Sequence, residues 1–68
     1  MIICVHRLGS EGYKVKVYAG ADILYYDAKD VLIIPETLIT NFNELVIDAE
    51  AIEVINDRAI IIRRQSNP

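Results

Sequence analysis

Aliphatic side chains are abundant in this sequence for its length. Ile, Leu and Val account for 12, 5 and 6 of the 68 residues, and 53% of the chain is hydrophobic. A domain of about 60 residues buries only about 60% of the surface that its unfolded chain exposes, so one copy has too little interior for all of these side chains. We therefore expect one folded domain over residues 1–68 that forms a homo-oligomer, with another protein as the alternative partner. The competing interpretation is that the surplus stays on the surface, since more than half of ordinary protein surface is apolar.

The first third of the chain has the pattern of a β-hairpin. Residues 13–19 alternate between apolar and polar side chains, which is typical of a strand with one buried face. Residues 2–7 precede them, and the connecting loop contains Gly9 and Gly12, which can supply the positive φ angles of a hairpin loop. We predict two antiparallel strands here.

The rest of the chain predicts further short strands separated by polar turns. The apolar runs that we assign to strands are residues 23–26, 31–34, 45–49, 51–55 and 58–63. A four-residue turn at 27–30 would make a second hairpin, and the two-residue turn signal Asn56-Asp57 would make a third. The second and third hairpins can be aligned at an offset of about 29 residues, which indicates either a duplication or only the features that any two hairpins share.

The stretch that follows Pro35 fits neither pattern alone. Residues 36–43 have apolar positions at both helical and strand spacing, and their β-branched residues and asparagines favour a turn or an irregular strand over a helix. Pro35 has no N–H for a sheet ladder, so it ends a strand or begins a short helix. We expect residues 65–68 to be frayed. The predicted fold is all-β, a small antiparallel barrel or sandwich of six or seven short strands with at most one helical turn near residue 35.

Two of the predicted strands are apolar on both faces. Such strands, at 31–34 and 59–62, can bury one face in the domain and the other against a second subunit. Tyr25 and Tyr26 place one aromatic ring on each face of their strand, so one of them can anchor an interface. The predicted oligomer interface consists of Val31, Ile33, Ile60, Ile62 and Tyr26.

Charge is divided unevenly along the chain. The net charge is −3 and the sequence pI is about 4.9, yet residues 1–20 carry +2, residues 21–57 carry −8 and residues 58–68 carry +3. If the first hairpin and the last strand are neighbours in the sheet, the two basic ends could form one positive face for RNA or DNA, with Tyr18 available for stacking. The residues of this alternative basic face are Lys14, Lys16, Arg63 and Arg64. The acidic pI and the lack of a nucleic-acid-binding motif disfavour this alternative.

Residues that could carry chemistry are sparse. Cys4 and His6 are two apart on a predicted strand and therefore share a face, but catalysis would also need a group to orient the imidazole and an oxyanion site. The sequence has no signature of either group. A thiol-dependent enzyme is therefore only the third hypothesis, after self-association and nucleic-acid binding. Two pairs of acids, Asp27 with Asp30 and Asp48 with Glu50, are the candidate metal ligands. Each pair lies in or beside a predicted turn, where Asp commonly hydrogen-bonds its own backbone, so we do not expect a metal site.

The expected protein is therefore non-enzymatic, with no catalytic residues, no metal and no cofactor. Three scattered glycines match no nucleotide-binding fingerprint. The longest apolar runs fall far below the roughly 18 residues of a membrane span, and the N-terminus lacks the marks of a signal peptide. Cys4 is the only cysteine, which excludes an intramolecular disulfide. We expect a cytoplasmic, self-associating interaction or structural module that does not enter a membrane.

Overall fold

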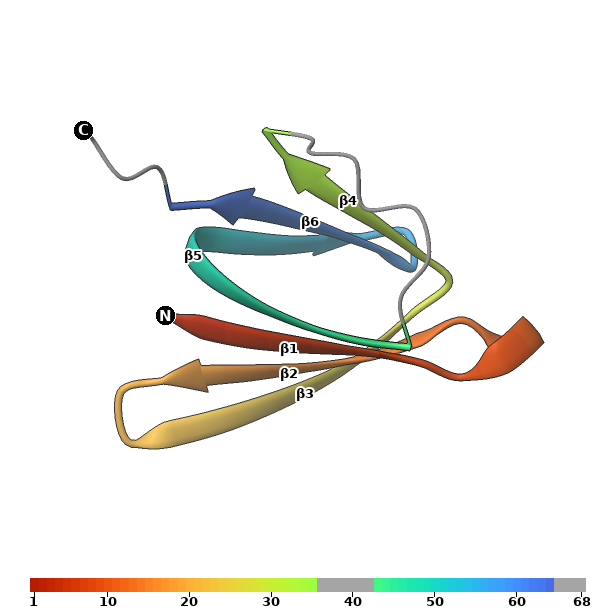
Figure 1. Ribbon diagram of the computed structural model, residues 1–68, viewed down its shortest axis with the longest axis horizontal. Coiled ribbons are helices and arrows are strands. Elements are labelled where there is room, and N and C mark those ends of the chain that lie inside the picture. Colours follow the sequence, from red (N-terminus) through yellow and green to blue (C-terminus); the bar gives the residue numbers. More distant parts are fainter. Residues whose placement is uncertain (36–42, 65–68) are drawn as a thin grey trace.

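The computed structural model of the protein describes residues 1–35 and 43–64, and most of these residues lie in strands (Figure 1). The six strands are β1 (Ile2–Arg7), β2 (Tyr13–Ala19), β3 (Asp22–Ala28), β4 (Asp30–Ile34), β5 (Glu44–Ile55) and β6 (Arg58–Arg63). One 3-10 turn, η1 (Gly9–Glu11), joins β1 to β2, and it is the only helix among the described residues. The prediction of an all-β fold is confirmed. Within the same residues, no helix is long and apolar enough to cross a membrane.

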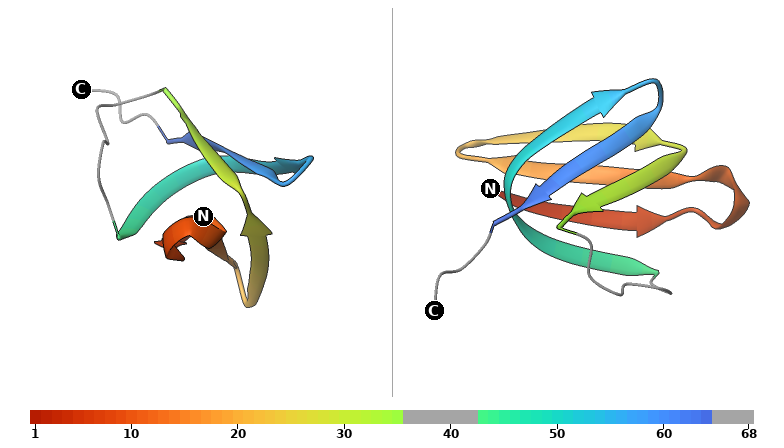
Figure 2. Two further views of the ribbon diagram at one scale, coloured as in Figure 1. Left: turned by 90° about the vertical axis from the view of Figure 1, so that its right-hand side faces the viewer. Right: turned by 90° about the horizontal axis from the view of Figure 1, so that it is seen from above.

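The strands form one sheet in the order β3-β2-β1-β5-β6-β4. Figure 2 shows how this sheet folds over itself: β1, β2 and β3 lie in one layer, and β4, β6 and the end of β5 cross over them in a second layer. The order ends at β3 and β4, which do not pair with each other, so the sheet is not closed into a barrel. Of the two predicted arrangements, a barrel or a sandwich, the structure excludes the closed barrel, and the two layers correspond to the sandwich.

Strand β5 connects the two layers. Two separate strands were expected at 45–49 and 51–55, but the structure has a single strand whose first half pairs with β1 and whose second half pairs with β6. The register of β5 against β6 shifts between Ala49 and Ala51, so Glu50 lies at a β-bulge. Because a bulge bends a strand and increases its twist, one continuous strand can turn the corner between the layers.

The first and third predicted hairpins are confirmed. Strands β1 and β2 pair antiparallel across the loop that contains Gly9 and Gly12, both of which have positive φ. Strands β5 and β6 pair antiparallel across Asn56 and Asp57, whose φ angles of 50° and 62° place both in the left-handed region. Two consecutive residues with positive φ are the requirement of a type I′ turn.

The second predicted hairpin is wrong. Strand β3 continues through Asp27 to Ala28, so only Lys29 separates it from β4, and one residue is too short a loop for the reversal of a hairpin. The chain instead crosses from one layer to the other, where β4 pairs with β6 in parallel. The sheet is consequently mixed rather than wholly antiparallel. Because β3 and β4 do not pair, the similarity at an offset of 29 residues does not correspond to two equivalent hairpins.

The core lies between the two layers. Ten buried hydrophobic residues contribute to it: Ile3, Val5, Val15, Val17, Ala28, Ile33, Ile47, Ala49, Ala59 and Ile61. They come from all six strands at every second position, which gives each strand an inner and an outer face. The question of helix or strand at 36–43 and the expected fraying of 65–68 fall on residues 36–42 and 65–68, which lie outside the described part of the chain.

Candidate functional site

The outer face of the second layer carries a row of exposed aliphatic side chains. Ile33, Ala59 and Ile61 point inward, so the alternating residues of β4 and β6 point away from the core. Leu32, Ile34 and Ile62 keep 37%, 45% and 40% of their surface exposed, and Ile60 is half-buried. We call these four residues, Leu32, Ile34, Ile60 and Ile62, the β4–β6 patch.

The parallel register makes the β4–β6 patch continuous. Leu32 lies directly opposite Ile60, and Ile34 lies directly opposite Ile62. On the other side of β6, Ala51 of β5 lies opposite Ile62. Side chains that face each other across neighbouring strands are in contact range, so Ile34, Ile62 and Ala51 form one apolar row across three strands. In the next row, Leu32 and Ile60 are apolar, and Glu53 of β5 lies on the other side of Ile60.

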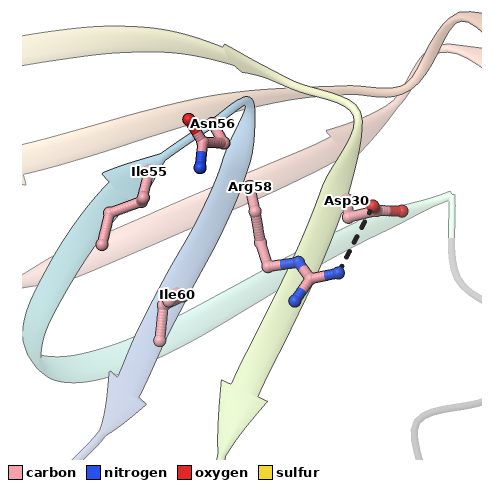
Figure 3. Close-up of a pocket in the computed structure, with 5 residues that line it drawn as sticks. All are labelled: Asp30, Ile55, Asn56, Arg58 and Ile60. Carbon is pink, nitrogen blue, oxygen red and sulfur yellow. Dashed lines mark ion pairs between the residues drawn. The ribbon is translucent and has the colours of Figure 1, made fainter.

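Polar groups border the β4–β6 patch at the beginning of β6. Arg58 Nη2 lies 3.9 Å from Asp30 Oδ2 (Figure 3), and both side chains are more than half exposed. Together with Ile55, Asn56 and Ile60, this pair lines a shallow depression of about 360 Å³. An exposed ion pair at this distance adds little stability, so its main effect is to give one end of the patch a defined charge pattern.

The residues predicted for the oligomer interface lie on two different faces. Ile60 and Ile62 belong to the β4–β6 patch, whereas Val31 and Ile33 are on the inner face of β4 and Tyr26 packs against the core from β3. An apolar run gives no indication of which alternate residues point outward. The parallel pairing of β4 with β6 determines which residues point outward, because it aligns Ile33 with the buried Ile61. Leu32 and Ile34, which the sequence did not indicate, therefore lie beside Ile60 and Ile62 on the outer face.

The four residues of the alternative basic face are not brought together. Lys14 and Lys16 alternate with buried valines and therefore lie on the outer face of β2, while Arg63 ends β6 and Arg64 follows it. Strands β1 and β5 separate β2 from β6, so the condition on which that face depended is not met. Arg63 also alternates with Ile61 and Ala59, which places it on the side of the sheet that faces the core.

A second depression, of about 400 Å³, lies on the outer face of the first layer. Its lining residues are Cys4, His6, Lys14, Lys16, Tyr18, Tyr25 and Glu44. Lys16 Nζ lies 5.3 Å from the centre of the Tyr18 ring and 5.7 Å from the centre of the Tyr25 ring, which is within the range of cation–π interactions. A hydrogen bond with the Tyr18 side chain is the main reason that the pKa of Lys16 lies above its ordinary value, and the charge of Tyr18 acts in the same direction.

Cys4 and His6 share this outer face, as the strand pattern predicts. Cys4 lies opposite Lys16 on one side and Val46 on the other, and His6 Nδ1 lies 4.0 Å from Glu44 Oε2. Both partners of the His6–Glu44 pair are more than half exposed. Residues 1–35 and 43–64 contain no cluster of three or more His, Cys, Asp or Glu side chains that could hold a metal ion.

Comparisons with known proteins leave the fold and the surfaces as the basis for a functional argument. No protein-family model matches the chain, and no curated protein or solved structure is significantly similar to it.

Proposed function

We propose that the protein is a non-enzymatic interaction module that self-associates through the β4–β6 patch. The observation that carries the proposal is the alignment of Leu32 with Ile60 and of Ile34 with Ile62 on the outer face of one layer. Contiguous exposed apolar surface of this kind, bordered by polar groups, is typical of a protein-interaction site.

A second copy is the occupant that suits this surface best. Two sheets pack face to face when their apolar sides interdigitate, and the β4–β6 patch is an apolar sheet face. The border is also self-complementary, because Asp30 and Arg58 lie side by side and a two-fold axis would bring each near its opposite charge on the other copy. A two-fold contact would therefore combine apolar burial in the centre with charge pairing at one end.

The energetic gain is moderate. Full burial of an aliphatic side chain contributes about 1.5–3 kcal/mol, and the patch residues are already more than half covered. Each would contribute about 1 kcal/mol on association, and two copies would provide several such side chains. Association also has a cost in translational and rotational entropy, so we expect a micromolar rather than a nanomolar dimer.

Sedimentation velocity over a concentration series tests the proposal. The wild type should gain mass as concentration rises through the micromolar range. Ile62→Lys should raise the dissociation constant of the patch contact about tenfold or more, because a lysine between Ile34 and Ala51 would be desolvated in the contact. Val46→Lys is the matched control, since Val46 is an equally aliphatic strand residue, 60% exposed, on the outer face of the other layer.

Circular dichroism would establish that both variants are folded. A wild type that stays monomeric throughout, or an Ile62→Lys variant that associates as well as Val46→Lys, would overturn self-association through the patch.

A second candidate function is the binding of single-stranded nucleic acid on the outer face of the first layer. Tyr18 and Tyr25 flank Lys16 there, and Lys14 is on the same face of β2. Exposed aromatic rings beside lysines on a sheet surface can stack bases and attract phosphates. Three acidic residues, Asp27, Glu44 and Asp48, border the same face, which weakens this candidate relative to self-association.

Fluorescence anisotropy with a labelled single-stranded RNA tests this second candidate. Binding should weaken steeply with added salt, and the double change Lys14→Glu and Lys16→Glu should abolish it. Lys29→Glu is the control for general charge repulsion, because Lys29 is an exposed residue between β3 and β4 and its change lowers the net charge by half as much as the double change does. Salt-independent binding, or equal loss in the control, would contradict the candidate.

A further inference from the structure

Strand β3 forms one edge of the sheet and presents apolar side chains on both of its faces. Ile23, Leu24 and Tyr25 are 47%, 43% and 61% exposed. Of the described residues, only those of β2 pair with this strand, so the backbone groups on its other side have no strand partner there. A row of free N–H and C=O groups flanked by exposed apolar side chains is a template for an additional strand.

The features that normally protect an edge strand are missing from the middle of β3. Protected edges carry a proline, a lysine, a bulge or a very short strand. Strand β3 pairs with β2 through seven consecutive residues without a register shift, and its four central residues, Ile23 to Tyr26, are uncharged. The opposite edge differs, since β4 has only five residues and is followed by Pro35, which has no N–H.

We propose that β3 pairs antiparallel with β3 of a second copy of this chain, about a two-fold axis, to continue the sheet across the dimer. This extends the proposed self-association to a second surface and does not depend on the β4–β6 patch. A strand partner of the same sequence is favoured because apolar side chains would then face one another at the middle of the pairing. Aromatic and β-branched cross-strand pairs stabilise a sheet.

The geometry of the strand restricts the register. The backbone groups of alternate residues point to opposite sides of a strand, and only those that point away from β2 can bond the new partner. Two residues that face each other must therefore be an even number of positions apart, or be the two copies of the same residue. The axis consequently lies midway between the two copies of one residue of β3, on which the pairing is centred. Centring on Leu24 pairs Ile23 with Tyr25 and Leu24 with itself. Centring on Tyr25 pairs Leu24 with Tyr26 but places Ile23 opposite Asp27.

Both of these registers also keep the acidic ends apart. Asp22 faces Tyr26 when the axis passes through Leu24, and it faces Ala28 when the axis passes through Tyr25. In neither arrangement does Asp22 or Asp27 lie directly opposite another acid, which would be destabilising. Pairing of β3 with β4 of a second copy has no comparable advantage, because β4 begins with Asp30 and carries no basic residue.

Cysteine cross-linking gives a direct test, since in a two-fold pairing only the residue on the axis faces itself. Single cysteines replace Ile23, Leu24, Tyr25 or Tyr26 in a background of Cys4→Ser and Ile62→Lys, which removes the native thiol and the patch contact. Val46→Cys in the same background is the control for random collision, because Val46 is exposed on an inner strand of the sheet. The measurement is the initial rate of disulfide-linked dimer formation under mild oxidation.

We expect one maximum, at Leu24→Cys or Tyr25→Cys, about tenfold above the Val46→Cys rate, because directly opposed Cα atoms are within disulfide range and the neighbouring positions are not. Rates equal to the control at all four positions would overturn the pairing of β3 with β3. Equal enhancement at all four positions would indicate parallel, in-register pairing of the two strands and would overturn the two-fold arrangement. Failure of this proposal is distinguishable from failure of the patch proposal, which is measured by Ile62→Lys with an unmodified β3.

Adding Leu24→Lys to the Ile62→Lys protein provides a second readout that requires no oxidation. A charged residue in the middle of an edge strand blocks pairing, so the protein should change from dimer to monomer in sedimentation velocity. Val46→Lys in the same protein should leave the dimer intact. A dimer that persists with Leu24→Lys would overturn the proposal.

Discussion

The backbone N–H of Lys29 donates a 2.7 Å hydrogen bond to the carbonyl oxygen of Asp57. This bond joins the single residue between β3 and β4 to the turn between β5 and β6. It fixes the first residue of β4, Asp30, beside the first residue of β6, Arg58, from which the two strands run in parallel. The outward alignment of the β4–β6 patch therefore depends on a contact between two connections that are 28 residues apart.

The turn that supplies this carbonyl oxygen provides a prediction about stability. Asp57 has a φ of 62°, which glycine adopts without strain and β-branched residues adopt poorly. Asp57→Gly should raise the free energy of unfolding by up to about 1 kcal/mol, and Asp57→Val should lower it by about 1–2 kcal/mol. Urea denaturation measures both. A valine variant as stable as the glycine variant would contradict the turn assignment.

Adjacent residues on opposite faces of β6 should respond very differently to truncation. Ile61 is fully buried, so Ile61→Ala should lower the free energy of unfolding by about 2–5 kcal/mol through lost burial and a cavity. Ile62→Ala should lower it by less than about 1 kcal/mol when measured at a concentration where the protein is monomeric. The comparison uses the same side chain one residue apart. Similar losses at both positions would mean that the assignment of the two faces is wrong.

Two glycines in the first connection form another matched pair. A Cβ atom on Gly12, which has a φ of 101°, would lie 2.5 Å from the carbonyl oxygen of Ala28. Gly9 has a φ of 64°, and no atom lies within 4 Å of the corresponding position. In thermal or urea unfolding, Gly9→Ala should lose about 1 kcal/mol and Gly12→Ala clearly more, because backbone must move to admit its methyl group. Equal losses would exclude the steric contribution of Ala28.

The alkaline titration of Lys16 should depend on the Tyr18 hydroxyl. The pKa of Lys16 is raised chiefly by its hydrogen bond with Tyr18, so Tyr18→Phe should move the midpoint back toward the ordinary value of a lysine. Because the folded-state pKa is raised, the associated stabilisation is complete below the unfolded-state pKa and is lost as pH rises through the folded-state value. NMR titration of the Lys16 side chain follows the midpoint. A midpoint that is unchanged in Tyr18→Phe would assign the shift to another cause.

Local sequence patterns were sufficient for the elements whose partners are close in the chain. The alternation over residues 13–19 and the two positive-φ residues Asn56 and Asp57 each describe a conformation that is set within a few residues. The pattern around Glu50 is also a local one, and it predicted a break between two strands. The structure instead has a bulge there within one strand. Periodicity reports the disturbance in the pattern but not whether the strand continues.

The candidate site required information that no local pattern contains. In the apolar run Val31–Ile34, every residue can face either the core or the solvent, and the sequence analysis assigned Val31 and Ile33 to the interface. The partner strand decides the matter, because the parallel register with β6 aligns Ile33 with Ile61, which is buried. The separation of Lys14 and Lys16 from Arg63 likewise depends on which strands lie between β2 and β6.

The sequence by itself determined that this chain is built from strands, where most of them begin and end, and that its aliphatic side chains exceed what obvious inner faces can bury. The tertiary structure alone decided that β4 pairs with β6 rather than β3, that β5 links two layers, and that Leu32, Ile34, Ile60 and Ile62 form one outer surface. The physical reason is that strand formation reflects side chains within a few residues, whereas pairing and layering depend on backbone hydrogen bonds and burial between segments far apart in the chain.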